Sequence, residues 1–401
     1  MYEHANPVLY SRFLPHPSEG KHLLTRRDFQ IAALRCSAAL LLSPLRLVGE
    51  ADLSPTIAGL YRKAIVIDSL CCPLVDSAMP DPDLVRVIRD SGITAVNCTV
   101  SERDFEGTIR NIAWLQALVD KYPDTFTIIR HQPEIALTKS SNKVGILPGF
   151  QDTAFLEEKP ERIAMFRDLG VRIMQLTYNK RSIFGDGCLE PGNAGLSPAG
   201  IAAIKKMNEI GVALDLSHSG YHTTAEAIVA SSKPVLISQS GCAAVYAHPR
   251  NKPDEILKSL ADRGGYFGVY LMPYLVASPT VPTRRHVLDH LLHAIEVCGA
   301  DHVGIGSDGS IQAVTLTPAQ KAAFDADIAR RKQLGIGAPG EDRYPWVPDL
   351  NGPSYMEVIA EELSRRGQSS SVIEKVLGAN FQRVLGDIWG TEGTPAASSL
   401  T

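Results

Sequence analysis

The stretch that most constrains the fold runs from residue 212 to 251, where two short apolar runs each end in a polar cluster. The run 212–216 is followed by Ser217-His218-Ser219, and the run 234–237 is followed by Ser238-Gln239-Ser240, with residues of helical composition between them. Two buried strands joined by a helix form the unit from which parallel α/β sheets are built. In such sheets the chemistry lies at the carboxyl ends of the strands, so both clusters are candidate site residues. A lone His218 could equally end a strand and bond to a neighbour, but the repeated pattern favours a site.

The same alternation of apolar runs and helical segments continues through most of the chain. Further predicted strands cover 64–68, 93–98, 125–129, 144–147, 171–176, 265–271 and 303–305. Eight or nine strands that alternate with helices are too many for a simple two-layer arrangement. The pattern therefore predicts an α/β fold of the (β/α)8 barrel type.

Length and composition are consistent with one large domain. We expect the barrel over 54–390, an insertion over its mouth near 315–346, closing helices after it, and a flexible tail at 391–401. The formal net charge of −4 is spread over mixed signs, which argues against a nucleic-acid partner. No apolar run is long enough for a membrane span, and seven cysteines do not suggest a disulfide scaffold.

Residues 1–50 differ in composition from the rest. Arg26-Arg27 precede a modest apolar run, which resembles a twin-arginine export signal and predicts a periplasmic or exported protein. Arg35 and Arg46 interrupt that run, and no clear cleavage site follows it. The alternative is a basic amphipathic helix on the domain of a cytoplasmic protein.

Several of these strand ends, taken together and in order, resemble one family, the renal (membrane) dipeptidases. The matching pieces include Leu176-Thr177-Tyr178-Asn179, Asp215-Leu216-Ser217-His218, Pro249-Arg250-Asn251, Gly304-Ile305-Gly306-Ser307-Asp308 and Gly378-Ala379-Asn380-Phe381. They lie between residues 55 and 389. The family consists of zinc enzymes on a (β/α)8 barrel, so the resemblance implies that fold and a small-molecule substrate derived from amino acids. It also leaves a homodimer open.

The resemblance implies five zinc-ligand positions, and this chain keeps the ligand type at only one of them. His218 is retained, whereas Leu70, Cys72, Gln151 and Gln239 stand where the family has His, Asp, a bridging Glu and His. Two zinc ions need anionic or imidazole ligands, and the bridging ligand must be a carboxylate. We therefore expect no metal cofactor. The alternative is one zinc ion held by Cys72, His218 and Asp308.

Other family positions are filled by residues that can still carry chemistry. Asp308 matches the family's catalytic carboxylate, Arg250 matches its clamp for the substrate carboxylate, and Tyr178 replaces a His that contacts substrate. The predicted catalytic residues are thus His218, Asp308, Cys72 and Tyr178. The predicted substrate-binding residues are Arg250, Gln151, Gln239 and Asn179. The alternative interpretation of Arg250 is a structural ion pair with Asp254, and we favour the clamp.

The cysteines allow more than one interpretation. Cys72 could be a nucleophile assisted by His218, or Cys71 and Cys72 could join His218 around one zinc ion. Adjacent residues on a strand point to opposite faces, which makes the second arrangement awkward. Free cysteines usually fill space in a core. Cys188 and Cys242 lie near the predicted site loops, and nothing in the sequence assigns them a role.

Three functional hypotheses follow. We favour an enzyme without the two-zinc site that uses acid–base chemistry on a small amino-acid- or peptide-derived carboxylate, as in the maturation of a peptide-derived natural product. Isomerisation, tautomerisation, cyclisation and addition are all reactions of this type. The second hypothesis is a zinc dipeptidase with an altered site, for example a mononuclear one. The third is a non-catalytic binder of small peptides.

Overall fold

The computed structural model describes residues 54–390 apart from 76–77, 103, 157–158 and 334–337. The predicted export signal in residues 1–50 and the predicted tail at 391–401 lie outside the described residues. None of the described helices is both long enough and apolar enough to cross a lipid bilayer.

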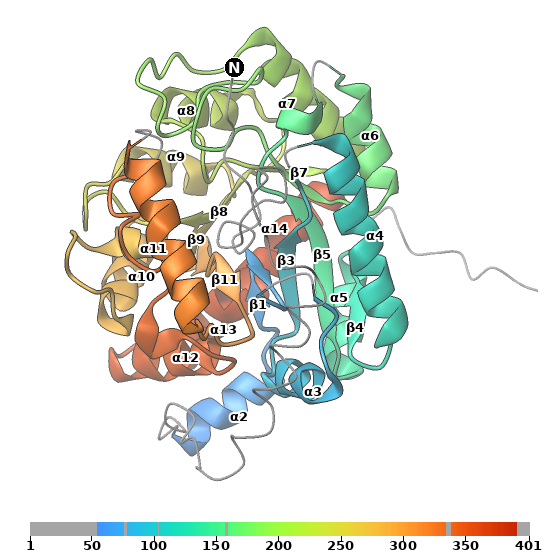
Figure 1. Cartoon of the computed structure of the whole chain (residues 1–401), viewed down its shortest axis with the longest axis vertical. Helices are drawn as coiled ribbons and strands as arrows, with labels where there is room; N and C mark the ends of the chain where they lie inside the picture. Colours follow the sequence, from blue (N-terminus) through green and yellow to red (C-terminus); the bar gives the residue numbers. More distant parts are fainter. Residues whose placement is uncertain (1–53, 76–77, 103, 157–158, 334–337, 391–401) are drawn as a thin grey trace, which may run out of the picture.

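Parallel strands form the centre of the molecule, with helices around them (Figure 1). The main path of the sheet runs β1-β3-β5-β6-β7-β8-β9-β10, and every strand pair in it is parallel. The backbone N–H of Ser69, just after β1, donates to the carbonyl of Ile305 in β10 at 2.9 Å and joins the two ends of the path. The predicted (β/α)8-type barrel is therefore confirmed.

The strand bounds agree closely with the predicted apolar runs. The strands are β1 Ile67–Asp68, β2 Cys71–Cys72, β3 Ala95–Thr99, β4 Phe126–Ile128, β5 Val144–Phe150, β6 Ile173–Gln175, β7 Ala213–Asp215, β8 Leu236–Ser240, β9 Tyr266–Val269, β10 Val303–Ile305 and β11 Gly309–Ser310. The strand predicted at 125–129 corresponds to β4, which pairs only with β5 and lies off the main path. β2 and β11 form a separate two-stranded ladder just beyond β1 and β10.

Helices cover the outside of the barrel and close its amino end. They are α2 Pro55–Lys63, α3 Pro82–Asp90, α4 Phe105–Lys121, α5 Pro133–Ser140, α6 Glu161–Asp168, α7 Pro198–Ile210, α8 Tyr221–Ala230, α9 Asp254–Asp262, α10 Arg284–Cys298, α11 Pro318–Gln333, α12 Tyr355–Arg365, α13 Ser370–Glu374 and α14 Asn380–Trp389. The caps follow the expected chemistry. Ser197 accepts from the N–H of Gly200 at the start of α7, and Gly211 ends that helix with φ 69°.

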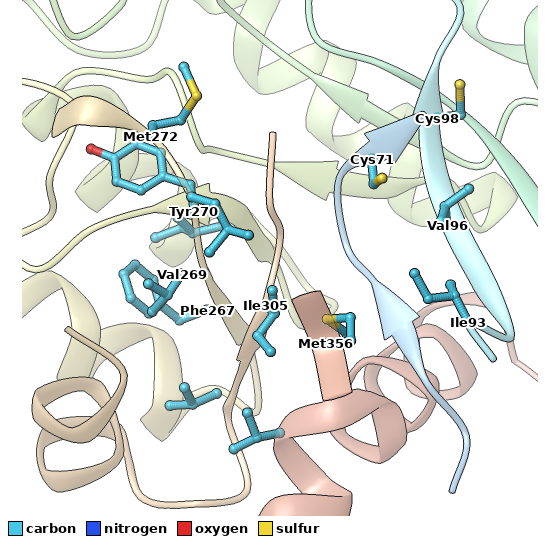
Figure 2. Close-up of a cluster of buried hydrophobic side chains, with 14 of the residues drawn as sticks. Cys71, Ile93, Val96, Cys98, Phe267, Val269, Tyr270, Met272, Ile305 and Met356 are labelled. Atoms are coloured by element: carbon cyan, nitrogen blue, oxygen red, sulfur yellow. The ribbon is translucent and has the colours of Figure 1, made fainter. Parts of the chain in front are cut away.

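Two apolar layers hold these elements together. The inner layer takes side chains from seven strands, among them Ile67, Leu147 and Tyr266, and α14 seals it with residues such as Phe381. The outer layer fills the space between the strands and the surrounding helices. Figure 2 shows part of it, where Val269 and Ile305 of neighbouring strands lie near Met356 of α12. Burial on both faces explains why the strands are short, continuous apolar runs.

The last of the closing helices is divided in the structure. α13 and α14 are separated by the π-turn Lys375–Ala379. A Cβ at Gly378 would meet the backbone carbonyl of Ile65, so the turn brings the chain against the segment that leads into β1. Close packing of backbone on backbone, which periodicity does not encode, explains the interruption.

The insertion that follows β11 packs on loops at the carboxyl ends of the strands. Its helix α11 spans Pro318–Gln333 and lies within the range 315–346 predicted for the insertion. Beyond α11, the carbonyl of Pro339 accepts from Nε2 of His248, in the loop after β8, at 2.7 Å. Arg343 donates to the carbonyl of Val276, in the loop after β9, at 3.0 Å. The insertion therefore lies on the side of the barrel where the predicted site residues are found.

Candidate active site

The predicted site residues come together at the carboxyl ends of the barrel strands. Gln151 directly follows β5, His218 follows β7 and Asp308 follows β10, while Gln239 lies in the last part of β8. All four side chains are buried, between 0% and 5% exposed. Parallel strands bring these residues to one end of the barrel although they are far apart in sequence.

His218 is held by both its ring and its backbone. Its Nδ1 lies 2.8 Å from Oδ1 of Asn179, and the ring of Tyr178 stacks on it with centroids 4.1 Å apart and an interplanar angle of 22°. The backbone N–H of Cys188 donates to the carbonyl of His218 at 2.8 Å. Asn179 and Tyr178 thus contact the imidazole directly.

The carbonyls on either side of His218 accept from two buried cations of one loop. Nη1 of Arg250 donates to the carbonyl of Ser217 at 2.5 Å, and Nζ of Lys252 donates to the carbonyl of Ser219 at 2.6 Å. Burial lowers the pKa of Lys252 to about 7. Lys252 was not recognised from the sequence. Its position two residues after Arg250, in the same loop, is the only signal that could have indicated it.

Arg250 is almost fully buried, with 2% of its surface exposed. Its guanidinium carbon lies 5.8 Å from the ring centroid of Tyr270, and Nη2 has no hydrogen-bond partner among the described residues. The alternative ion pair with Asp254 is not formed, because Asp254 contacts Nε2 of His293 at 2.8 Å. A buried guanidinium with an unsatisfied N–H is suited to binding a carboxylate.

Cys188 lies beside this cationic pair. Its thiol donates to Oδ1 of Asn179 at 3.5 Å. Burial raises the pKa of the Cys188 thiol, and the positive charges of Arg250 and Lys252 oppose that rise. Cys242, which the sequence also placed near the site, instead bonds to His290 through its backbone N–H at 2.9 Å.

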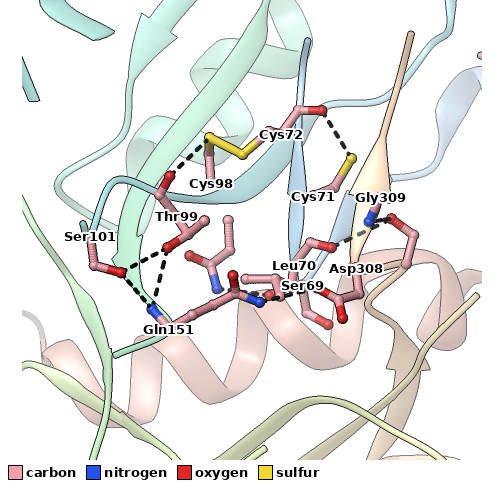
Figure 3. Close-up of a disulfide and its surroundings, with 12 residues drawn as sticks. Ser69, Leu70, Cys71, Cys72, Cys98, Thr99, Ser101, Gln151, Asp308 and Gly309 are labelled. Atoms are coloured by element: carbon pink, nitrogen blue, oxygen red, sulfur yellow. Dashed lines mark hydrogen bonds between the residues drawn. A yellow bond between two sulfur atoms is a disulfide. The ribbon is translucent and has the colours of Figure 1, made fainter. Parts of the chain in front are cut away.

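Asp308 receives hydrogen bonds from two carboxamides. Nε2 of Gln151 donates to Oδ1 of Asp308 at 3.0 Å (Figure 3). The carboxamide of Gln239 satisfies its neighbours when its nitrogen faces both oxygens of Asp308, at 2.6 and 2.7 Å. Its oxygen then accepts from Gln151 at 2.6 Å and from Nε2 of His218 at 3.1 Å. In the opposite orientation the carboxamide oxygen of Gln239 would face only acceptors. The neighbouring groups therefore determine which end of the carboxamide is oxygen and which is nitrogen.

The backbone around Asp308 is fixed by a second buried carboxylate. Asp68 accepts from the N–H groups of Leu70 and Ser307 at 3.0 and 2.9 Å and from the hydroxyl of Tyr355 at 2.5 Å. Burial raises the pKa of Asp68 to about 6, although these hydrogen bonds oppose the rise. Asp308 itself has a φ of 58°, a left-handed conformation that is uncommon outside glycine and is often found at functional sites.

The structure contradicts the predicted role of Cys72. Its sulfur is joined to Cys98, at the end of β3, in a disulfide (Figure 3). A disulfide sulfur is neither the thiolate that attacks a substrate nor the thiolate that binds zinc. Cys72 is therefore neither a catalytic nucleophile nor a metal ligand in this state. Cys71 is a free, buried thiol, as the space-filling interpretation expects.

The residues at the family's ligand positions do not fit a two-zinc centre. Leu70 is aliphatic, Cys72 is disulfide-bonded, and Gln151 and Gln239 are neutral amides. Within the part of the chain that the structure describes, no group of three His, Cys, Asp or Glu side chains is arranged to hold a metal ion. The alternative one-zinc set of Cys72, His218 and Asp308 loses a ligand to the disulfide.

Known proteins with similar sequences and folds agree with this architecture. "Dipeptidase verJ" of Clonostachys rogersoniana is 29% identical over 359 residues, which cover 85% of this chain and 83% of that protein. The crystal structure of an amidohydrolase from Pseudomonas aeruginosa is 31% identical with a TM-score of 0.71, over 83% of this chain and 99% of that one.

A second solved structure supports the fold alone. The probable dipeptidase PvdM from Pseudomonas aeruginosa is 18% identical with a TM-score of 0.68, over 83% of this chain and 98% of that one.

The model of the membrane dipeptidases, peptidase family M19, matches residues 81–320. That match includes β3 to β10 and every strand end that contributes to the site except the one after β1. The chain belongs to the membrane dipeptidase family, peptidase family M19.

Proposed function

We propose that this protein is an M19-family enzyme that works without the family's two-zinc centre. It would use acid–base chemistry on a small carboxylate-bearing molecule derived from an amino acid or peptide. The observation that carries the proposal is the set of hydrogen bonds joining Gln151, Gln239, Asp308 and His218, because neutral amides fill positions where zinc needs charged ligands. One class of substrate suited to this acid–base chemistry is the precursors of peptide-derived natural products.

The proposed chemistry assigns a role to each group. The guanidinium of Arg250 would hold the substrate carboxylate, since its Nη2 is buried without a partner among the described residues. A substrate group that displaces the carboxamide of Gln239 from Nε2 of His218 would exchange a proton with the imidazole. Isomerisation or tautomerisation would then return that proton to a different atom, so no oxidant and no metal-bound water is needed.

The first test is metal content. Full-length protein purified without chelators is expected to carry well under one equivalent of zinc and to leave simple dipeptides intact. The variant that restores Leu70→His, Cys72→Asp, Gln151→Glu and Gln239→His together is the positive control for zinc uptake. Each single restoration should take up no zinc, because one added ligand leaves the ion under-coordinated. The measurement is elemental analysis, and stoichiometric zinc at the barrel mouth in anomalous scattering would overturn the proposal.

We also propose that the protein is exported. Arg26-Arg27 before an apolar run support this, and so does the Cys72–Cys98 disulfide, because disulfides persist mainly in oxidising compartments. Mature protein from the native host is expected to begin near Ala51. N-terminal sequencing of the periplasmic and cytoplasmic fractions tests this, and an intact Met1 terminus on the active protein would contradict it.

A further inference from the structure

A buried carboxylate without a metal ion needs another source of positive charge. Asp308 is 5% exposed, and in a barrel mouth without zinc its negative charge would be costly to bury alone. The carboxamide nitrogens of Gln151 and Gln239 both approach its oxygens. Both glutamines occupy former ligand positions, so the residues that replace the metal ligands also solvate the carboxylate.

The hydrogen bonds of the two amides form a consistent set. The carboxamide nitrogen of Gln239 lies within hydrogen-bond distance of both oxygens of Asp308. The NH2 group of Gln151 donates to Asp308 and to the carboxamide oxygen of Gln239. That oxygen also accepts from Nε2 of His218, so the two amides connect His218 to Asp308.

The same hydrogen bonds fix the orientation of His218. Oδ1 of Asn179 accepts from the thiol of Cys188, so it is also the acceptor for Nδ1–H of the imidazole. Nε2–H donates to Gln239. The carboxamide of Gln239 thus lies between the imidazole of His218 and the carboxylate of Asp308.

From this geometry we propose that Gln239, supported by Gln151, is a positioning residue that replaces the metal pair. Its carboxamide bridges His218 and Asp308 and holds both reacting groups at the barrel mouth. The role assigned to Gln239 rests on the proposed function in one respect only, namely that His218 and Asp308 react with substrate. The hydrogen bonds themselves can be tested without knowing the substrate.

The sharpest test reverses the polarity of one hydrogen-bonded pair. Gln239→Glu places a second carboxylate against Asp308, and we expect it to lower Tm by about 3–6 °C. Adding Asp308→Asn supplies an NH2 group that can donate to the new carboxylate. The double variant Gln239→Glu/Asp308→Asn should therefore regain most of the lost Tm. If the two substitutions instead lower Tm additively, the proposal that Gln239 bridges His218 and Asp308 is wrong.

A matched control is available elsewhere in the barrel. Gln175 is also buried, 1% exposed, and its Nε2 donates to a buried carboxylate, that of Asp215, at 3.2 Å. Gln175→Glu should lower Tm in the same way. When Gln175→Glu is combined with Asp308→Asn, the two decreases in Tm should be additive, because Gln175 and Asp308 are not hydrogen-bond partners.

A spectroscopic measurement separates the bridge from a general loss of stability. In protein with 15N-labelled histidine, the ring Nε2–H resonance of His218, assigned through His218→Gln, should be retained in Gln239→Glu, which keeps an accepting oxygen. It should be lost or strongly shifted in Gln239→Met, which has none, and unchanged in Gln175→Glu. An unchanged His218 resonance in Gln239→Met would overturn the proposal. Activity is not needed for any of these readouts, so their failure is distinct from failure of the proposed function.

Discussion

His218→Ala is expected to lower turnover by about 10²–10⁴-fold, the usual contribution of a positioned general acid or base. Imidazole is the only side chain whose unperturbed pKa lies near neutrality, so it exchanges protons without extreme tuning. In this structure its ring is fixed by Asn179, Tyr178 and Gln239. Loss of the ring should therefore reduce kcat more than it raises KM. Steady-state kinetics with the native substrate measure both quantities.

The competing view is that His218 is a remnant of a lost zinc site with no role in turnover. His218→Gln distinguishes the two views, because glutamine still offers polar atoms but cannot act as an acid or base near pH 7. His290→Gln is the matched control, since His290 is fully buried and both its ring nitrogens are hydrogen-bonded, to the N–H of Cys242 and the carbonyl of Leu275. The control should lose stability but keep its turnover. Turnover of folded His218→Gln within about threefold of wild type would remove His218 from the mechanism.

Much of the fold could be predicted because the burial of a strand determines which residue types its sequence contains. Strands covered on both faces are short apolar runs, and their polar ends identify the side of the barrel where chemistry occurs. His218 and Gln239 were found in this way, and both lie at the predicted strand ends. The resemblance to the dipeptidases added Asp308 and Arg250, which no local pattern identifies.

The disulfide and the amide network could not be predicted for a different reason. Cys72 and Cys98 are 26 residues apart, and only the packing of β2 beside β3, which are not paired with each other, brings the sulfurs together. Similarly, Gln151 and Gln239 were predicted as substrate-binding residues, and their contacts with Asp308 were not foreseen. A sequence shows which groups are present at strand ends, but it does not show which of them bond to one another.

Under the proposed function, the two glutamines illustrate how a site could lose one chemistry and keep its architecture. Replacing a ligand such as Glu by Gln removes a negative charge but retains an oxygen and adds an NH2 group. We propose that this NH2 group, beside Asp308, takes the stabilising role of a metal ion. The barrel mouth holds a buried imidazole, carboxylate and guanidinium, the groups that the proposed acid–base chemistry requires.

Replacing Arg250 by Met is expected to raise KM by about 10–100-fold, because a hydrogen-bonded charge pair contributes about 1.5–3 kcal/mol. The effect on kcat should be smaller, since the guanidinium would bind a carboxylate that does not itself react. Arg250 also donates to the carbonyl of Ser217, so some loss of stability is expected as well. Kinetics and thermal unfolding of the same preparation separate the two effects.

Arg172→Met provides the control for that loss of stability. Arg172 is also buried and donates to backbone carbonyls, those of Arg130 and Arg167 at 2.8 and 2.6 Å, but it precedes β6 at the amino end of the barrel. Its replacement should lower Tm without changing KM, because no substrate reaches that end. Arg250→Met and Arg172→Met could lower Tm alike and both leave KM unchanged. In that case Arg250 only supports the turn around His218, and the substrate carboxylate is bound elsewhere. A KM that rises only in Arg250→Met instead assigns the unpaired Nη2 to substrate, because that nitrogen is the part of the guanidinium that the described residues leave without a partner.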